Sequence, residues 1–210
     1  MSRRCLFPLQ QTIGSAILLA ILAFQPAAAR AQGFAPIPEP TIDDAAPGVD
    51  NTANADSLPV EFRHRPVFYR SHYPVGTIVV NTSDRFLYLI MSGTTAMRYA
   101  IGVGRDGFQW GGTHRITRKQ EWPDWTPPPE MIARQPYLPR FMAGGPGNPM
   151  GARALYLGAT VYRIHGTNQP QTIGSAVSSG CFRLVNNDVI DLFERVPVGT
   201  KVVVRQRPEL

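Results

Sequence analysis

Between residues 77 and 204 the sequence alternates short runs of β-branched and aromatic residues with clusters of Gly, Asn, Ser and Asp. Runs of this length, bounded by turn-forming residues, are typical of β-strands. Strands are therefore predicted over residues 77–81, 85–91, 97–103, 114–120, 154–157, 160–164 and 201–204. The Thr82-Ser83-Asp84 sequence between the first two predicts a β-hairpin, and the whole series predicts a sheet-forming domain.

Residues 187–196 follow a different period, in which apolar side chains recur at the spacing of one helix face. These apolar residues are Val189, Ile190, Leu192, Phe193 and Val196. Asn187 is the predicted N-cap, and Asp188 falls in the first turn, where a negative charge favours the helix. Many strands with one clear helix predict a mainly β fold, a curved sheet or sandwich with a few accessory helices.

Residues 122–151 differ from the rest of the chain because they contain eight prolines and little predicted strand. A connection of this length is unusual, and long loops often act as lids or binding walls. A stiff structural excursion packed on the sheet edge is the other interpretation, and the sequence leaves both open. If the loop covers a site, its aromatic residues Trp122, Trp125 and Tyr137 are candidates for substrate binding.

Residues 1–31 are predicted to be a secretory signal peptide. Two arginines precede an uncharged run at residues 13–24, which is shorter than the ~20 residues that span a bilayer. Small residues at 29 and 31 then predict cleavage before Gln32. An uncleaved membrane anchor is the alternative, whereas a lipid anchor is disfavoured because Cys5 precedes the apolar run. We expect export to the periplasm or cell envelope, with no stable membrane span after cleavage.

Residues 32–61 contain six acids, no base and five prolines, a composition that predicts an extended, disordered tether. Residues 62–210, the predicted folded body, carry 18 basic and nine acidic residues, a net charge of +9. A basic domain often binds nucleic acid, but an exported chain without runs of Lys and Arg is a poor candidate for that partner. Its charge is better suited to the anionic polymers of a cell envelope.

Removal of the predicted signal peptide leaves Cys181 as the only cysteine, so no disulfide can form within the remaining chain. Acyl transfer by a thiol needs a base that takes its proton and donors for the developing oxyanion. His165, 16 residues earlier, ends a predicted strand and can supply the base. Gly180 lets the backbone turn closely, and Arg183 offers a fixed positive charge. The alternative is that Cys181 is a small buried apolar residue and His165 a hydrogen-bonded structural one.

The sequences HGTN at 165–168 and SSGCFRLVNNDVIDL at 178–192 together resemble the signature of the L,D-transpeptidase catalytic domain, the YkuD-type family. The family pattern is HG followed about 14 to 17 residues later by S/T-x-G-C, a hydrophobic residue and then R or N. The resemblance extends from about residue 77 through residue 204. Phe182 replaces the usual aliphatic residue. Ser179 stands where some members have a second histidine, so His165 is the only base candidate in the motif.

The resemblance implies a β-rich, sandwich-like catalytic domain over residues 62–210, with the cysteine in a cleft beneath a variable lid, here residues 122–151. It implies a cysteine-dependent acyltransferase that acts on peptidoglycan stem peptides and serves cell-wall biogenesis and cell shape. The thiol would attack the carbonyl between the L-centre of diaminopimelate and the terminal D-Ala, which releases D-Ala and leaves a thioester. An amine on a neighbouring stem would then take the acyl group and form a 3→3 cross-link.

Roles follow from position in the motif. Cys181 matches the nucleophile and His165 the base, with the carbonyl of Gly166 orienting the imidazole. The backbone N–H groups of Gly180 and Cys181 are candidates for the oxyanion hole. Further residues expected to line the site or bind substrate are Ser179, Arg183 and Asn168.

The same residues are compatible with other functions. If water is the acceptor, the enzyme is an L,D-carboxypeptidase, and if an envelope protein supplies the amine, the enzyme anchors that protein to peptidoglycan. A non-catalytic peptidoglycan-binding module is a further alternative, which the intact Cys181–His165 pair argues against. No cofactor is implied, and no metal site is predicted because His64, His72 and His114 show no ligand spacing.

Overall fold

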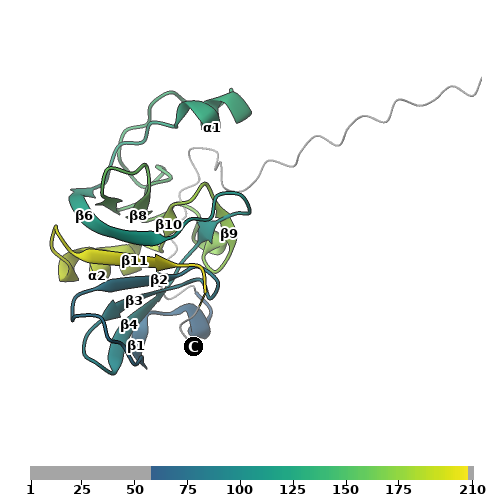
Figure 1. The fold of residues 1–210 in the computed structure, drawn as a ribbon. Helices are drawn as coiled ribbons and strands as arrows, with labels where there is room; N and C mark the ends of the chain where they lie inside the picture. The colour runs from purple at the N-terminus through teal and green to yellow at the C-terminus, as the bar shows by residue number, and fades with distance from the viewer. Residues whose placement is uncertain (1–57, 208–210) are drawn as a thin grey trace, which may run out of the picture. The chain divides into compact units, whose positions relative to one another are not determined.

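The computed structural model describes residues 58–207, which Figure 1 shows as a ribbon. The predicted signal peptide, residues 1–31, and residues 32–57 of the predicted tether lie outside the described residues. The described part is mainly β with few helices, as predicted. None of the helices within residues 58–207 is long and apolar enough to cross a membrane.

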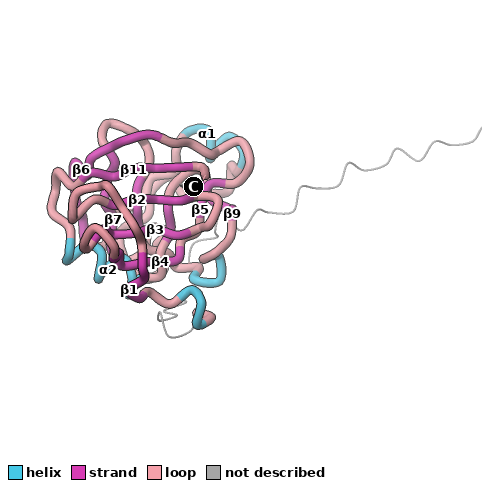
Figure 2. Tube along the Cα trace, turned by 60° about the horizontal axis from the view of Figure 1, so that its bottom comes forward, coloured by secondary structure: helices cyan, strands magenta, loops and turns pink. Residues whose placement is uncertain are grey.

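Nine strands form one continuous sheet in the order β1-β4-β3-β2-β11-β6-β7-β8-β10, and β5 pairs separately with β9. The strands are β1 (Arg65–Phe68), β2 (Ile78–Asn81), β3 (Phe86–Ile90), β4 (Thr95–Ala100), β5 (Val103–Gly104), β6 (Gly112–Glu121), β7 (Arg153–Leu157), β8 (Arg163–His165), β9 (Ala176–Ser178), β10 (Phe182–Arg183) and β11 (Lys201–Arg205). Figure 2 shows β6, β11, β2, β3 and β4 running side by side.

The long strand β6 joins the two parts of this sheet. Residues 112–115 of β6 pair with β11, and residues 116–121 pair with β7. The register shifts between Ile116 and Arg118, and such an irregularity bends a strand. The bend lets β2, β3 and β4 share one hydrophobic core with β7, β8 and β10. The architecture is therefore a curved, sandwich-like sheet around a single main core.

The predicted hairpin is present as β2 and β3, which pair with Ile78 opposite Leu89 and Asn81 opposite Phe86. In its turn, the side-chain amide of Asn81 donates a hydrogen bond of 2.6 Å to the Asp84 carboxylate. All of β2 is buried because Ile78 and Val80 pack in the main core on one face of the sheet and Val79 packs in a smaller cluster on the other. This burial explains why its sequence, IVVN, has an apolar run rather than an alternating pattern.

The predicted helix at 187–196 is confirmed as α2 (Asn186–Arg195), but its predicted cap is wrong. The N-cap is Val185, which makes no side-chain cap hydrogen bond, and Asn187 is exposed. The apolar face of α2 packs against β7 and contributes to the main core. At its first turn the Asp188 carboxylate is buried and lies 2.7 Å from Nδ1 of His64, which ties the helix to the start of the described chain.

Several boundaries differ from the predictions. The range 97–103 contains two strands, β4 and β5, and β8 begins at Arg163 rather than 160. The Thr160 hydroxyl donates to the Leu157 carbonyl at 2.6 Å, which holds this stretch in a turn before β8 starts. The short edge strand β1 was not predicted. Residues 58–61, predicted as the end of the tether, lie within the described residues, where Leu58 is buried in a small core cluster and η3 (Val60–Phe62) follows.

The proline-rich segment 122–151 is folded on itself. It contains one short helix, α1 (Pro129–Arg134), which begins with proline at a position where the missing N–H costs nothing. Trp125 and Met142 exchange two backbone hydrogen bonds, each of 2.8 Å. A separate hydrophobic cluster fixes the segment on β7 and consists of Trp125, Met131, Leu138, Met150 and Ala154. The segment is therefore a packed excursion that is also positioned to form a wall.

Candidate active site

His165 ends strand β8, and Cys181 lies directly before β10, the parallel neighbour of β8. In the ladder between β8 and β10, His165 lies opposite Arg183, and Cys181 immediately precedes β10. Side chains alternate along a strand, so Cys181 and Arg183 share one face of this pair with Arg163 and His165. The intervening residues point to the other face and belong to the main hydrophobic core. The strand pairing thus places a thiol, an imidazole and two guanidinium groups on one surface.

The imidazole of His165 is held in one orientation and is kept neutral. The ring is buried, with 4% exposed, and its Nδ1 lies 2.6 Å from the Gly166 carbonyl oxygen. A carbonyl only accepts, so Nδ1 carries the hydrogen and Nε2 retains its lone pair. Burial lowers the pKa of His165 to about 3, assisted by the positive charges of Arg183 and Arg163 and opposed by hydrogen bonds to the backbone at Gly166 and Met150. At neutral pH the ring is therefore an uncharged base.

The loop before the cysteine depends on glycine at position 180. Gly180 has φ +105°, and a Cβ on it would lie 2.5 Å from Cε1 of Tyr162, so a side chain does not fit. Trp110 fixes the same residue by donating its indole N–H to the Gly180 carbonyl at 2.6 Å. The Trp110 ring also stacks on Tyr162, with 4.3 Å between the ring centroids. These contacts fix the carbonyl and the turn of the residue next to Cys181.

Ser178 ties this loop together from the inside. Its hydroxyl donates to the carbonyl of Cys181 at 2.6 Å and accepts from the N–H of Gly180 at 3.1 Å. In this structure the Gly180 N–H donates within the loop, and its role as an oxyanion donor stays a prediction. Gly180 also shapes the turn that presents Cys181.

A pocket of about 80 Å³, called the cysteine pocket below, brings the main candidates together. Cys181 and His165 both line it, as do Ser179 and Arg183, which were predicted to do so. The other lining residues are Trp125, Pro128, Met131, Pro149, Met150, Val161, Tyr162 and Arg163. The cysteine pocket therefore has basic groups from β8 and β10 on one side and an apolar wall from residues 122–151 on the other.

Only one of the predicted substrate-binding residues, Trp125, lines the cysteine pocket. Tyr137 is 67% exposed, and Trp122 is also exposed, so neither is held against the pocket wall. Asn168 is buried and donates its side-chain amide to the Gly147 carbonyl at 3.1 Å, where it supports the proline-rich segment. The structure does not bring these three residues to the thiol.

Four residues that shape the site were missed by the sequence analysis. Strand alternation could have identified Arg163, because it lies two residues before His165 on the same strand face. Tyr162, Met150 and Trp110 carry no local signal, because they reach the site only through tertiary packing. Within the described residues, no group of three His, Cys, Asp or Glu side chains could hold a metal ion.

Solved structures share this fold. The chain aligns with L,D-transpeptidase 3 from Mycobacterium tuberculosis with a TM-score of 0.51 and 14% identity, covering 63% of this chain and 62% of that one. It also aligns with the C442S mutant of the Enterococcus faecium L,D-transpeptidase, with a TM-score of 0.51 and 18% identity, covering 63% and 50% of the two chains. At these identities the likeness establishes the fold.

Curated relatives and a family match identify the chain more closely. It is 44% identical over 140 residues to the probable L,D-transpeptidase ErfK/SrfK of Escherichia coli, which covers 62% of this chain and 44% of that protein. It is 43% identical over 141 residues to the probable L,D-transpeptidase YbiS of E. coli, covering 62% and 45%. The chain thus matches less than half the length of these relatives. Residues 76–204 match the YkuD family, described as the L,D-transpeptidase catalytic domain, and the chain belongs to that family.

Proposed function

We propose that the protein is a cysteine-dependent peptidoglycan L,D-transpeptidase, with Cys181 as nucleophile and His165 as base. The observation that carries this proposal is the placement of both residues in one pocket, with the imidazole neutral and its Nδ1–H fixed on the Gly166 carbonyl. A base in this state can accept a proton on Nε2 without first losing one. Membership of the L,D-transpeptidase catalytic domain family supports the choice of substrate.

The low pKa of His165 determines how the thiol is activated. With a pKa of about 3, the His165 ring holds no second proton at neutral pH and is free to accept the thiol proton. We expect a neutral thiol–imidazole pair, in which His165 takes the proton as the sulfur attacks the substrate carbonyl.

The first half-reaction is an acyl transfer to Cys181. The thiol proton moves to Nε2 of His165 while the sulfur bonds to the carbonyl carbon between diaminopimelate and the terminal D-Ala. The resulting tetrahedral oxyanion collapses, the C–N bond breaks, and the imidazolium returns its proton to the departing D-Ala amine. The products are a thioester between Cys181 and the stem peptide, free D-Ala, and a neutral His165.

The charges around the cysteine pocket fit this reaction. Arg183 and Arg163 are close enough to His165 to lower the pKa of its ring, so their fields also reach the reacting carbonyl. A positive field stabilises the developing oxyanion and attracts the carboxylate of the terminal D-Ala. The pocket, at about 80 Å³, has room for the reacting end of a peptide rather than for a whole stem.

The acceptor completes the reaction. Attack on the thioester by an amine of a second stem, with its proton passing to His165, gives a 3→3 cross-link. An amine on an envelope protein would anchor that protein, and water would give a tripeptide. We propose the stem amine as acceptor, and the envelope outside the cytoplasmic membrane as the site of action, in accord with the predicted signal peptide.

Tetrapeptide muropeptides incubated with the full chain, with products resolved by mass spectrometry, test the proposal. Cross-linked dimers and free D-Ala are expected from the wild type and from His72→Gln, which changes an exposed histidine outside the cysteine pocket. Cys181→Ala and His165→Asn are expected to lose D-Ala release. Turnover that persists in Cys181→Ala would refute the thiol mechanism, and tripeptides without dimers would replace transpeptidation by hydrolysis.

A further inference from the structure

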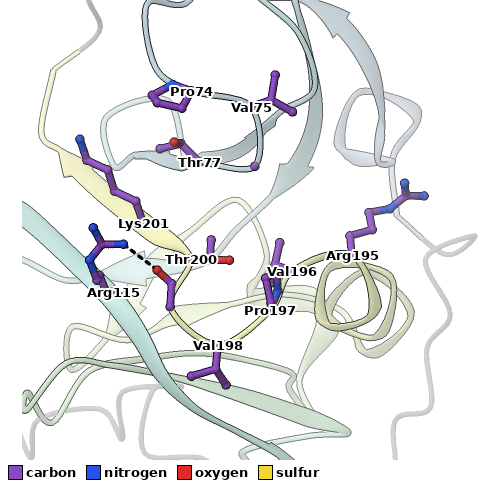
Figure 3. Close-up of a pocket in the computed structure, with 12 residues that line it drawn as sticks. Pro74, Val75, Thr77, Arg115, Arg195, Val196, Pro197, Val198, Thr200 and Lys201 are labelled. Carbon is purple, nitrogen blue, oxygen red and sulfur yellow. Dashed lines mark hydrogen bonds between the residues drawn. The ribbon is translucent and has the colours of Figure 1, made fainter.

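A second pocket, called the basic groove below, has a volume of about 510 Å³ and lies away from the thiol. Figure 3 shows it between the start of β11, the middle of β6, the end of α2 and the loop before β2. Its lining residues are Pro74, Val75, Gly76, Thr77, Arg115, Arg195, Val196, Pro197, Val198, Gly199, Thr200 and Lys201. None of these residues lines the cysteine pocket.

The two pockets lie at opposite ends of helix α2. The helix begins at Asn186, three residues after Arg183 of the cysteine pocket, and ends at Arg195 of the basic groove. A helix of 10 residues is about 15 Å long. A ligand in the basic groove is therefore separate from the reacting carbonyl, and the groove is not an extension of the cysteine pocket.

The basic groove has three cationic side chains and no acidic one. Arg195 is neutralised by a bidentate pair with Asp191 at 2.8 Å. Within residues 58–207, Arg115 and Lys201 form no ion pair with a carboxylate. Arg115 donates only to the Gly199 carbonyl, at 2.8 Å, and the Lys201 ammonium lies 5.2 Å from the centre of the Tyr73 ring. Two positive charges therefore face the groove without compensation by acidic groups of the described chain.

The floor of the basic groove contains two threonines. Thr77 and Thr200 are 3% and 7% exposed as whole residues, and both line the groove. Neither hydroxyl is among the buried polar atoms without a partner in the described chain, so the hydroxyls face the open groove. A hydroxyl can both donate and accept, so the two threonines add hydrogen-bonding groups for a ligand beside the two cations.

The rest of the lining narrows the choice of ligand. Val75, Pro197 and Val198 give the groove an apolar rim, and 510 Å³ is far more than one small ion fills. The ligand should therefore carry oxyanions on a partly hydrocarbon chain. We propose that the basic groove is a second, non-catalytic binding site for a carboxylate-bearing stem peptide, the choice of peptide resting on the proposed function. Bound there, a stem peptide would hold the enzyme on its polymer while another stem reacts at Cys181.

Titration calorimetry on the full chain tests this assignment. The probes are the tripeptide L-Ala-γ-D-Glu-diaminopimelate, the same tripeptide with its carboxylates amidated, and inorganic phosphate. Arg115→Gln combined with Lys201→Gln is expected to weaken tripeptide binding by about tenfold or more, because each charge-assisted hydrogen bond is a strong one. The matched control, Arg70→Gln with Arg207→Gln, removes equal charge from exposed positions outside the groove.

A second variant tests whether tripeptide binding depends on more than the net charge of the groove. Thr200→Val keeps the shape of the side chain and the net charge, and it is expected to weaken the tripeptide but not the amidated probe. Equal tripeptide affinity in the wild type and the groove variants would overturn the proposal, and so would phosphate binding without tripeptide binding. Turnover of a soluble tetrapeptide is expected to survive in the groove variants. The binding measurement therefore tests the groove, and the turnover measurement tests the proposed function.

Discussion

Acid should destabilise this protein through the buried imidazole of His165. The pKa of His165 in the folded protein is about 3, whereas histidine in an unfolded chain has a pKa of about 6.5. Below pH 6.5 the unfolded state therefore binds a proton that the folded state does not. Stability rises with pH wherever the unfolded state binds more protons, so the contribution of His165 is fully present above pH 6.5 and is lost as the pH falls toward 3.

The size of the loss follows from the same two pKa values. Each pH unit between them changes the free energy of unfolding by about 1.4 kcal/mol, so lowering the pH from 7 to 4.5 costs about 2.5 kcal/mol. A loss of this size is a large fraction of the stability of a typical domain. Other groups also titrate, among them Asp188, whose pKa is raised by burial. The wild type and a single variant share these other groups, so the contributions of the groups to the pH dependence cancel when the two proteins are compared.

The assay is urea unfolding at pH 7 and pH 4.5, with His165→Asn as the matched variant. Asparagine can still donate to the Gly166 carbonyl but does not titrate. We expect the wild type to lose about 2.5 kcal/mol more than the variant between the two pH values. NMR titration of the His165 ring in the wild type provides an independent readout, even if the variant folds poorly. Equal losses in both proteins, or a ring that titrates near pH 6.5, would refute the reasoning.

Two further predictions concern the loop that carries the thiol. Gly180→Ala places a Cβ against the Tyr162 ring at a positive φ, so we expect a loss of about 1–3 kcal/mol in urea unfolding together with lost turnover. Gly93→Ala, where a Cβ meets nothing within 4 Å, should leave both unchanged. Ser178→Ala removes the hydroxyl between the Gly180 N–H and the Cys181 carbonyl, and turnover should fall by about tenfold or more. Ser178→Thr keeps that hydroxyl and should restore the turnover; failure of this rescue would show that the hydrogen bonds do not position the thiol.

Local sequence signals predicted the parts of the fold that depend on neighbouring residues. The β2–β3 hairpin follows from two β-branched and aromatic runs joined by a short polar turn, and α2 follows from its apolar period. The N-cap of α2 was predicted two residues too late, because the helix already begins at Asn186, whose side chain accepts from the Ala152 N–H at 2.9 Å. The bend of β6 was not predictable from local sequence, because it depends on β11 pairing with one half of the strand and β7 with the other.

The sequence predicted the site residues that belong to the family motif. His165, Cys181 and Arg183 were named from their chemistry and position, and Ser179 from the resemblance to the family motif; all four line one pocket. The proline-rich segment contributes as a wall, but the sequence could not show which of its aromatic residues faces inward. Trp125 does so because it lies in the cluster that fixes the segment on β7, a contact between residues far apart in the chain.

The 16-residue spacing between His165 and Cys181 has a structural reason. Parallel strands cannot be joined by a tight turn and need a connection of about a dozen residues or more. β8 ends at His165 and β10 begins at Phe182, and the two are parallel neighbours. The chain between them makes η4 (Pro170–Thr172) and β9 before it returns. A shorter link could not bring the thiol back beside the imidazole in a parallel register. A shift of one residue would turn Cys181 toward the core, because alternate residues of the strand face opposite sides.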